Sequence, residues 1–465
     1  MKLLRMISIR RCIVLLIFFN ICHGIDVPRS SKSLLTAKAK SFTMQAGGIG
    51  GIFSKMGFNS DNNNNAMNGN NNVRTNQVVK KVDGIRHLTL GGSGIIVSEL
   101  GLGTQRWVSM DQNGPDEDLC YAMMDRAILS SGVNFLDTAE SYPIPSGPTR
   151  PEGLSEQIIG KWIKRSNISR DKIVISSKIT GGGNIKGNIR KDLLGSLKRL
   201  NTDYLDVYML HWPARYSPQA NWGQSLEYHH DREKYYKNCA SFEEVCQEMG
   251  KLEKEGLIRG WGMCNDNAHG LTACHYISKA LGFNPPVALQ NDYSLLNRRV
   301  EEHGISEAMS SIHCNTGFMA YNILAGGSLT GKYSTDIGNS GRDIMKYRGR
   351  FDEGGWGRTL YRYRSINALK ATERYEKLAK EFGLSITDLA LRFPRDREAV
   401  TTSLVGHTNM KQLEQSLKAF RAEPLSEDIR WRIDREHMME RNPIWNSERV
   451  GKDWYGEGEI GEPIP

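Results

Sequence analysis

The stretch VNFLDTAESYP, Val133 to Pro143, begins as an apolar run typical of a strand that is buried on both faces. The run turns polar at Asp137, and Tyr142 follows shortly after it. A carboxylate at the end of a buried strand is unusual because charged groups are rarely buried without a partner. The stretch therefore indicates a fold in which core strands end at a place where polar groups are needed.

The same pattern recurs between about residue 98 and residue 420, where eight apolar runs alternate with segments of helical periodicity. The runs are ELGLGT (99–104), VNFLDTA (133–139), KIVISSKI (172–179), YLDVYMLHW (204–212), IRGWGMC (258–264), PVALQND (286–292), GFMAYNI (317–323) and AVTTSLVG (399–406). Strands that alternate with helices imply parallel pairing and right-handed crossovers, and eight such units predict a (β/α)8 TIM barrel. A doubly wound open sheet is the competing topology.

The helical segments carry recognisable start and stop signals. After the fourth run, Ser241 and Glu244 form a capping box, and Gly256 ends the segment. The segment after the eighth run keeps one apolar face, made of Met410, Leu413, Leu417 and Phe420. Ahead of the first run, HLTLGGSGIIVS (87–98) predicts a β-hairpin that caps one end of the barrel.

The chain divides into four parts on composition. Residues 1–24 predict a signal peptide, because basic residues precede a short apolar run and small residues follow it. Residues 25–79 form a transit-like and then Asn-rich leader, residues 80–424 the barrel, and residues 425–465 a C-terminal extension. Such a leader predicts entry into the secretory pathway. The protein would then either reach a plastid by means of a two-part targeting sequence or be a lumenal or secreted enzyme.

Composition excludes several classes of protein. Hydrophobic residues make up 39% and charged residues 24%, which is ordinary for a globular chain and unlike a disordered or membrane-embedded one. The net charge of +9 is partly in the leader and otherwise scattered, so no nucleic-acid partner is expected. The mature form is not expected to associate with a membrane. The cysteines lack zinc-binding spacing, and no metal site is expected.

The active site of a TIM barrel lies at the carboxyl ends of its strands. Titratable groups stand where three adjacent runs end: Asp137 with Tyr142 beyond it, Lys178, and His211. A single buried Asp or Lys is usually half of a structural ion pair, and a single His is usually a core residue. Four such groups on neighbouring strands favour a catalytic site instead.

The chemistry of these four residues fits the protonation of a carbonyl oxygen. A tyrosine hydroxyl has a pKa of about 10 and donates a proton poorly unless a cation stabilises its phenolate. Lys178 would be that cation, Asp137 would hold it, and His211 would orient the substrate oxygen. The set contains no nucleophile for acyl transfer, so the electrons would come as hydride from a nicotinamide.

Two nucleotide-binding motifs are incomplete. GGSLTGKY (326–333) places Tyr333 where a P-loop needs Ser or Thr, and GGGNIKG (181–187) places Lys186 at the last glycine position of its fingerprint. Neither a nucleoside triphosphatase nor a classical dinucleotide loop is expected.

With these residues in view, the chain resembles the aldo-keto reductase family over roughly residues 87 to 424. The motifs that carry the resemblance are LGLGT, FLDTAESYP, SSKI, LHWP, LQNDYSLLNR, AYNILAGGSLTGKY and LVGHTNMKQL. They look most like the branch that holds bacterial Tas-like reductases and potassium-channel β subunits. The resemblance implies a TIM barrel, NADPH as cofactor, and Asp137, Tyr142, Lys178 and His211 as the catalytic tetrad.

The resemblance also implies a set of cofactor contacts. Asn265 and Gln290 would contact the nicotinamide carboxamide, and Tyr321 would stack on its ring. The pyrophosphate would lie on the segment that contains Asn322, Leu324, Gly326 and Lys332, and the 2′-phosphate beside Gly406, Thr408 and Gln412. A basic loop from Arg342 to Arg364 follows the pyrophosphate segment. Trp107 and Trp212 would line the substrate pocket. The aromatic residues of the long connection 213–240 would either wall this pocket or pack the connection onto the protein.

The chain departs from the family pattern at three places. Family members commonly have GVSN at the fifth strand, AYSPL at the seventh, and Asn in the last helix, whereas this chain has Cys264, Asn322 and Ser416 there. The expected function is the NADPH-dependent reduction of a small aldehyde or ketone. A nicotinamide-binding regulatory or redox-sensing protein is the alternative, and the oligomeric state stays open, with a monomer compatible with the sequence.

Overall fold

A computed structural model describes residues 73–110, 114–180, 187–217, 228, 230–231, 239–332, 363 and 366–444. Several predictions therefore lie outside the described residues. They are the signal peptide, the leader as far as residue 72, nearly all of GGGNIKG, most of both long connections, and the tail after residue 444.

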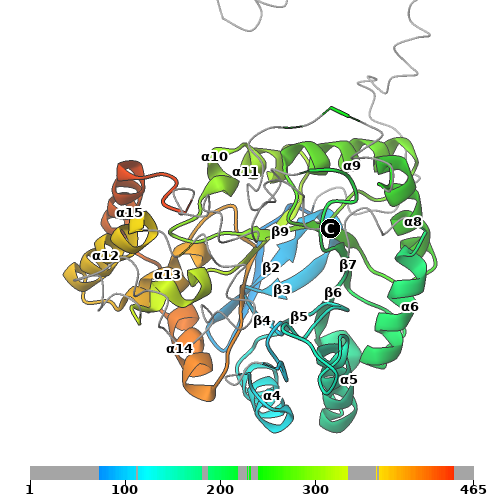
Figure 1. Cartoon of the computed structure of the whole chain (residues 1–465), viewed down its shortest axis with the longest axis horizontal. Coiled ribbons are helices and arrows are strands. Elements are labelled where there is room, and N and C mark those ends of the chain that lie inside the picture. Colours follow the sequence, from blue (N-terminus) through cyan, green and yellow to red (C-terminus); the bar gives the residue numbers. More distant parts are fainter. Residues whose placement is uncertain are drawn as a thin grey trace, which may run out of the picture. The chain divides into compact units, whose positions relative to one another are not determined.

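The eight predicted runs form the eight parallel strands of a closed barrel (Figure 1). They are β4 (Leu100–Gly103), β5 (Phe135–Asp137), β6 (Val174–Ile179), β7 (Val207–Leu210), β8 (Trp261–Cys264), β9 (Ala288–Asp292), β10 (Gly317–Tyr321) and β11 (Thr402–Val405). The ring closes because β11 pairs with β4 on one side and with β10 on the other. This closure confirms the predicted TIM barrel and excludes the open sheet.

Helices surround the strands, as Figure 1 shows. They are α4 (Glu117–Met124), α5 (Leu154–Ser166), α6 (Ile189–Leu200), α8 (Phe242–Lys254), α9 (Ala268–Ala280), α10 (Arg299–Glu302), α11 (Ile305–Met309), α12 (Ile366–Glu381), α13 (Ile386–Arg395), α14 (Met410–Arg421) and α15 (Glu427–Met439). The capping box predicted at Ser241 and Glu244 is present at the start of α8. Its apolar face packs on the barrel through Val245, Met249 and Leu252.

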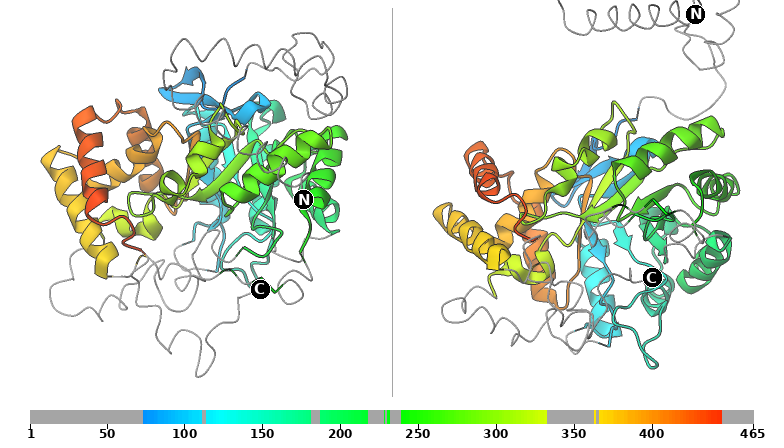
Figure 2. Two further views of the ribbon diagram at one scale, coloured as in Figure 1. Left: turned by 90° about the horizontal axis from the view of Figure 1, so that it is seen from above. Right: turned by 45° about the horizontal axis from the view of Figure 1, so that its top comes forward.

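The predicted hairpin is confirmed as β2 (Ile85–Leu90) and β3 (Ile95–Ser98), and a further strand, β1 (Val78–Val82), extends it to a three-stranded antiparallel sheet. The domain start predicted at residue 80 therefore falls inside β1. Leu90, Ile95 and Val97 pack with the side chains that fill the barrel interior. The hairpin closes one end of the barrel (left view of Figure 2), so the opposite, carboxyl end of the strands is left for a site.

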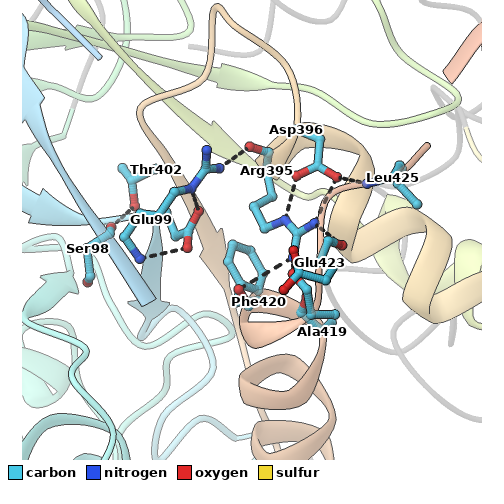
Figure 3. Close-up of polar contacts among 11 residues, drawn as sticks. Ser98, Glu99, Arg395, Asp396, Thr402, Ala419, Phe420, Glu423 and Leu425 are labelled. Atoms are coloured by element: carbon cyan, nitrogen blue, oxygen red, sulfur yellow. Dashed lines mark hydrogen bonds and ion pairs between the residues drawn. The ribbon is translucent and has the colours of Figure 1, made fainter. Parts of the chain in front are cut away.

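A buried arginine braces the end of the barrel that the hairpin covers (Figure 3). The Arg395 side chain is 2% exposed and pairs with Asp396 at 2.7 Å. It also donates hydrogen bonds to the carbonyl oxygens of Ala419 and Ala422, both at 2.7 Å. The last carbonyls of a helix have no partner within it, so Arg395 supplies the partners that α14 needs at its C-terminus. The backbone oxygen of Arg395 in turn accepts from Arg86 of the hairpin at 2.7 Å.

The described part of the C-terminal extension contains helix α15, which lies beside α12 in Figures 1 and 2. Ile429 and Ile433 are buried in the main core. Asp434 accepts from Arg298 at 2.7 Å and also pairs with Arg397. This helix therefore packs on the outer layer of the barrel. In the described part of the chain, no helix is both long and apolar enough to span a membrane.

Candidate active site

The four residues predicted as a tetrad come together at the open end of the barrel. Asp137 is the last residue of β5, and Lys178 lies near the end of β6. His211 directly follows β7, and its backbone N–H bonds the Ile179 carbonyl at 3.0 Å. Tyr142 stands in the turn beyond β5. The neighbouring strands β5, β6 and β7, with the turn after β5, thus bring all four side chains together.

Lys178 is the centre of this group. Its side chain is fully buried, and its Nζ donates to Asp137 Oδ2 at 2.7 Å and to the Thr138 carbonyl at 2.8 Å. The same nitrogen lies 5.2 Å from the centre of the Tyr142 ring. A buried ammonium group needs a counter-charge, and Asp137 supplies it. The positive charge is therefore fixed beside the tyrosine that would donate the proton.

Asp137 has a second partner that the sequence did not reveal. Gln290, on β9, donates from Nε2 to Asp137 Oδ1 at 2.9 Å. The Cys264 thiol in turn donates to Gln290 Oε1 at 3.6 Å. The Gln290 side-chain amide, which was expected to contact the nicotinamide carboxamide, thus lies against the Asp137 carboxylate in this structure. Both oxygens of Asp137 are held, which fixes the direction in which it faces Lys178.

His211 stands edge-on to Tyr142, with ring centres 5.7 Å apart and planes at 76°, and it stacks beside Trp212. Removal from water, with the nearby positive charge of Lys178 adding to it, holds the pKa of His211 well below its usual value. The imidazole is therefore neutral at pH 7. A neutral imidazole can orient a carbonyl oxygen without competing with Tyr142 as the acid.

Asn265, Tyr321 and His211 form one connected set. Asn265 has a left-handed backbone with φ of 60°, and its Nδ2 donates to the His211 carbonyl at 2.9 Å. The Tyr321 hydroxyl donates to Asn265 Oδ1 at 2.7 Å. The residues expected at the nicotinamide therefore lie next to the tetrad. Next to Asn265, Asp266 forms a two-point ion pair with Arg215, at 2.7 and 2.9 Å, and this pair fixes the loop after β7.

The segment expected at the pyrophosphate follows β10 and forms a short 3₁₀ helix, Ala325–Thr330. Asn322, Ala325, Gly326 and Gly327 all have positive φ angles. The Ser328 hydroxyl is buried and has no hydrogen-bond partner among the described residues. A series of left-handed turns with a buried, unpartnered hydroxyl is a feature that suits an anion. Leu324 and Lys332 lie in the same segment, with Lys332 exposed.

The residues expected at the 2′-phosphate gather at the start of α14. The Thr408 N–H donates to Gln412 Oε1 at 2.8 Å, and Asn409 caps the helix. Gly406 is exposed just before them. The positive end of a helix suits a phosphate. Ser416, which replaces the usual Asn, contacts buried His407 at 2.9 Å and so is engaged inside the protein.

The two tryptophans expected in the substrate pocket differ in exposure. Trp212 is partly exposed beside His211, whereas Trp107 is 2% exposed and packs in the main core. The Trp107 indole nitrogen has no partner among the described residues. Trp107 therefore offers little surface to a substrate in this structure.

A cavity of about 610 Å³ lies between strands β7 and β8 and helices α8 and α9. Its lining includes Leu210, Met263, Tyr216 and Tyr228. The described residues that line it include none of the four tetrad residues. The cavity is thus separate from the place where the Tyr142 and His211 rings face each other. Within the described ranges, no group of three or more His, Cys, Asp or Glu residues is arranged to hold a metal ion.

The chain is similar to known proteins over most of its length. The model of the aldo/keto reductase family matches residues 99–435. Protein tas of Escherichia coli is 32% identical over 364 residues, covering 76% of this chain and 97% of that protein. An aldo-keto reductase of Babesia bovis is 32% identical over 56% of this chain and 89% of its own length. A probable voltage-gated potassium channel subunit beta of rice is 28% identical over 73% of this chain and 93% of its own length. Because its fold is a closed eight-stranded barrel and because the family model and these relatives match it, the chain belongs to the aldo/keto reductase family. It is therefore an oxidoreductase that acts on carbonyl compounds.

Proposed function

We propose that the protein is an NADPH-dependent reductase that converts an aldehyde or ketone to an alcohol. The observation that carries this proposal is the fully buried Lys178 ammonium group, held by Asp137 and Thr138 beside the Tyr142 ring. This arrangement stabilises the phenolate that remains after Tyr142 donates its proton. The family supports the oxidoreductase class, and the particular cofactor and substrate are our proposal.

Each residue of the site then has a defined task. A bound nicotinamide would supply the hydride for the carbonyl carbon. Tyr142 delivers the proton to the carbonyl oxygen, and neutral His211 orients that oxygen by a hydrogen bond. Lys178 holds the negative charge that develops on Tyr142. Asn265 and Tyr321 provide polar and aromatic surface where the nicotinamide would lie, and the segment around Ser328 would hold the phosphates.

A binding and turnover assay tests the proposal. Purified protein is mixed with NADPH and a panel of small aldehydes and ketones, and the loss of NADPH absorbance is followed. We expect turnover on at least one carbonyl, and a drop of about 10²-fold or more in Tyr142→Phe with the affinity for NADPH retained. Full activity in Tyr142→Phe would refute the acid assignment. Tight NADPH binding with no turnover on any carbonyl would favour a redox-sensing role, which the similarity to the rice channel subunit makes the second candidate.

We also propose that the protein enters the secretory pathway, on the basis of its basic and apolar first 24 residues. The destination is then a plastid or the secretory lumen. A fusion of residues 1–79 to a fluorescent protein, compared with a fusion of residues 25–79, tests this. Identical cytosolic fluorescence from both fusions would refute it.

A further inference from the structure

Asp292 is a buried carboxylate at the end of β9, two residues beyond Gln290 and on the same face of the strand. The Tyr363 hydroxyl lies 2.8 and 2.7 Å from its two oxygens. The Asn322 amide nitrogen donates to the Tyr363 oxygen at 3.0 Å and lies 3.4 Å from Asp292 Oδ2. Residues far apart in the sequence thus meet at one carboxylate.

Asn322 connects this cluster to the segment Ala325–Thr330, where the pyrophosphate is expected to lie. While its amide nitrogen faces Asp292 and Tyr363, its Oδ1 accepts a hydrogen bond from the Gly326 N–H at 2.8 Å. Its backbone is also left-handed, with φ of 59°. Because both ends of the amide are bonded, the side chain has one orientation. That orientation fixes Gly326, and with it the turn that presents the unpartnered Ser328 hydroxyl.

A serine at position 322 could not make the same connection. A hydroxyl is too short to reach a carboxylate on the neighbouring strand and a backbone N–H four residues ahead at the same time. This chain thus has Asn where family members commonly have Ser, and both ends of the Asn322 amide form hydrogen bonds, with Tyr363 and with the Gly326 N–H.

We propose that Asp292 is a positioning residue for the diphosphate of a pyridine nucleotide, acting through Asn322 on the Gly326–Ser328 turn. Asp292 does not touch the nucleotide itself. It orients Asn322 and Tyr363, and the turn is held ready before the ligand arrives, which lowers the ordering cost of binding. This inference rests on the proposed function, because it assumes a nicotinamide dinucleotide as the ligand.

Calorimetric titration with NADP⁺ tests the inference without any catalytic readout. Asp292→Asn is expected to weaken NADP⁺ binding about tenfold or more, and Asn322→Ala by a similar factor. Because one residue acts through the other, the double variant Asp292→Asn/Asn322→Ala is expected to bind no more weakly than Asn322→Ala alone. Unchanged affinity in Asp292→Asn, or two effects that multiply in the double variant, would overturn the inference.

Two further variants separate positioning from general loss of stability. Tyr363→Phe removes one hydroxyl, is expected to fold normally, and should weaken NADP⁺ binding at least threefold. It carries the test if Asp292→Asn fails to fold, and wild-type affinity in Tyr363→Phe would then overturn the inference. Asp206→Asn is the matched control, because Asp206 is equally buried but lies at the amino end of β7, where it pairs with Arg170 and Arg259. It should leave the NADP⁺ affinity unchanged, and an equal loss there would also overturn the inference.

The two proposals fail in different ways. If the wild-type chain binds neither NADP⁺ nor NAD⁺, the proposed function fails, whatever the variants do. If the wild type binds a dinucleotide and the Asp292 and Tyr363 variants bind it equally well, only the role of Asp292 fails.

Discussion

Replacing Asp137 by Asn should show how strongly the tetrad depends on one buried charge pair. The variant leaves the fully buried Lys178 ammonium group with the Thr138 carbonyl and without its counter-charge. Removing one partner of such a pair costs about 3–5 kcal/mol, because the remaining charge has lost its compensation and has no access to water. Asp137→Asn should therefore lower the free energy of unfolding by about that amount and also reduce carbonyl reduction.

Urea unfolding followed by tryptophan fluorescence measures the change, in a double-mutant cycle with Lys178→Met. The double variant removes both charges and should cost clearly less than the sum of the two single changes. Glu117→Gln serves as the control, because the Lys161–Glu117 pair has an N–O distance of 3.1 Å but is largely exposed. That exposed pair should contribute about 0.2–1 kcal/mol. An Asp137→Asn variant within 1 kcal/mol of the wild type, as for the control, would refute the reasoning.

Three other changes follow from the structure. Arg395→Met should lower the free energy of unfolding by about 3–5 kcal/mol in urea titrations, while the NADPH affinity stays unchanged because Arg395 lies at the closed end of the barrel. Burial raises the pKa of Glu140 to about 7, because the folded state favours the neutral carboxyl group. The stabilising contribution of the neutral carboxyl group is therefore complete below pH 4.5 and is lost as the pH rises through 7. Glu140→Gln keeps an acceptor for the Thr180 N–H and should gain stability over the wild type as the pH rises; a pH-independent difference would contradict this. Gln290→Leu removes the hydrogen bond to Asp137 and should lower kcat about tenfold with little change in nucleotide Kd, whereas a loss confined to Kd would assign Gln290 to the nicotinamide.

The strands of the barrel were predictable because each is a continuous apolar run bounded by turn residues, and burial on both faces produces that pattern locally. All eight runs became barrel strands. The exception outside the barrel was β1, whose sequence VVKKV is exposed at every position. A strand that buries neither face carries no alternating pattern, and its pairing with β2 became visible only in the fold.

That the four candidate residues lie close together was predictable for a related reason. Asp137, Lys178 and His211 each stand near the end of an apolar run, and adjacent parallel strands bring the ends of successive runs together. Together with Tyr142, their types then suggested an acid, a cation with its counter-charge, and a hydrogen-bond donor. What could not be read was the second partner of Asp137, because Gln290 is 153 positions away along the chain.

The sequence by itself thus determined the order of strands and helices, and it predicted the end of the barrel at which the site lies and the four residues that would carry the chemistry. The tertiary structure alone decided that Gln290 faces Asp137, that His211 is neutral beside Lys178, and that Asn322 and Tyr363 converge on Asp292. The physical reason is that secondary structure follows from the periodicity of neighbouring residues. Hydrogen-bond partners and pKa shifts depend instead on which side chains a closed barrel brings within a few ångströms of one another.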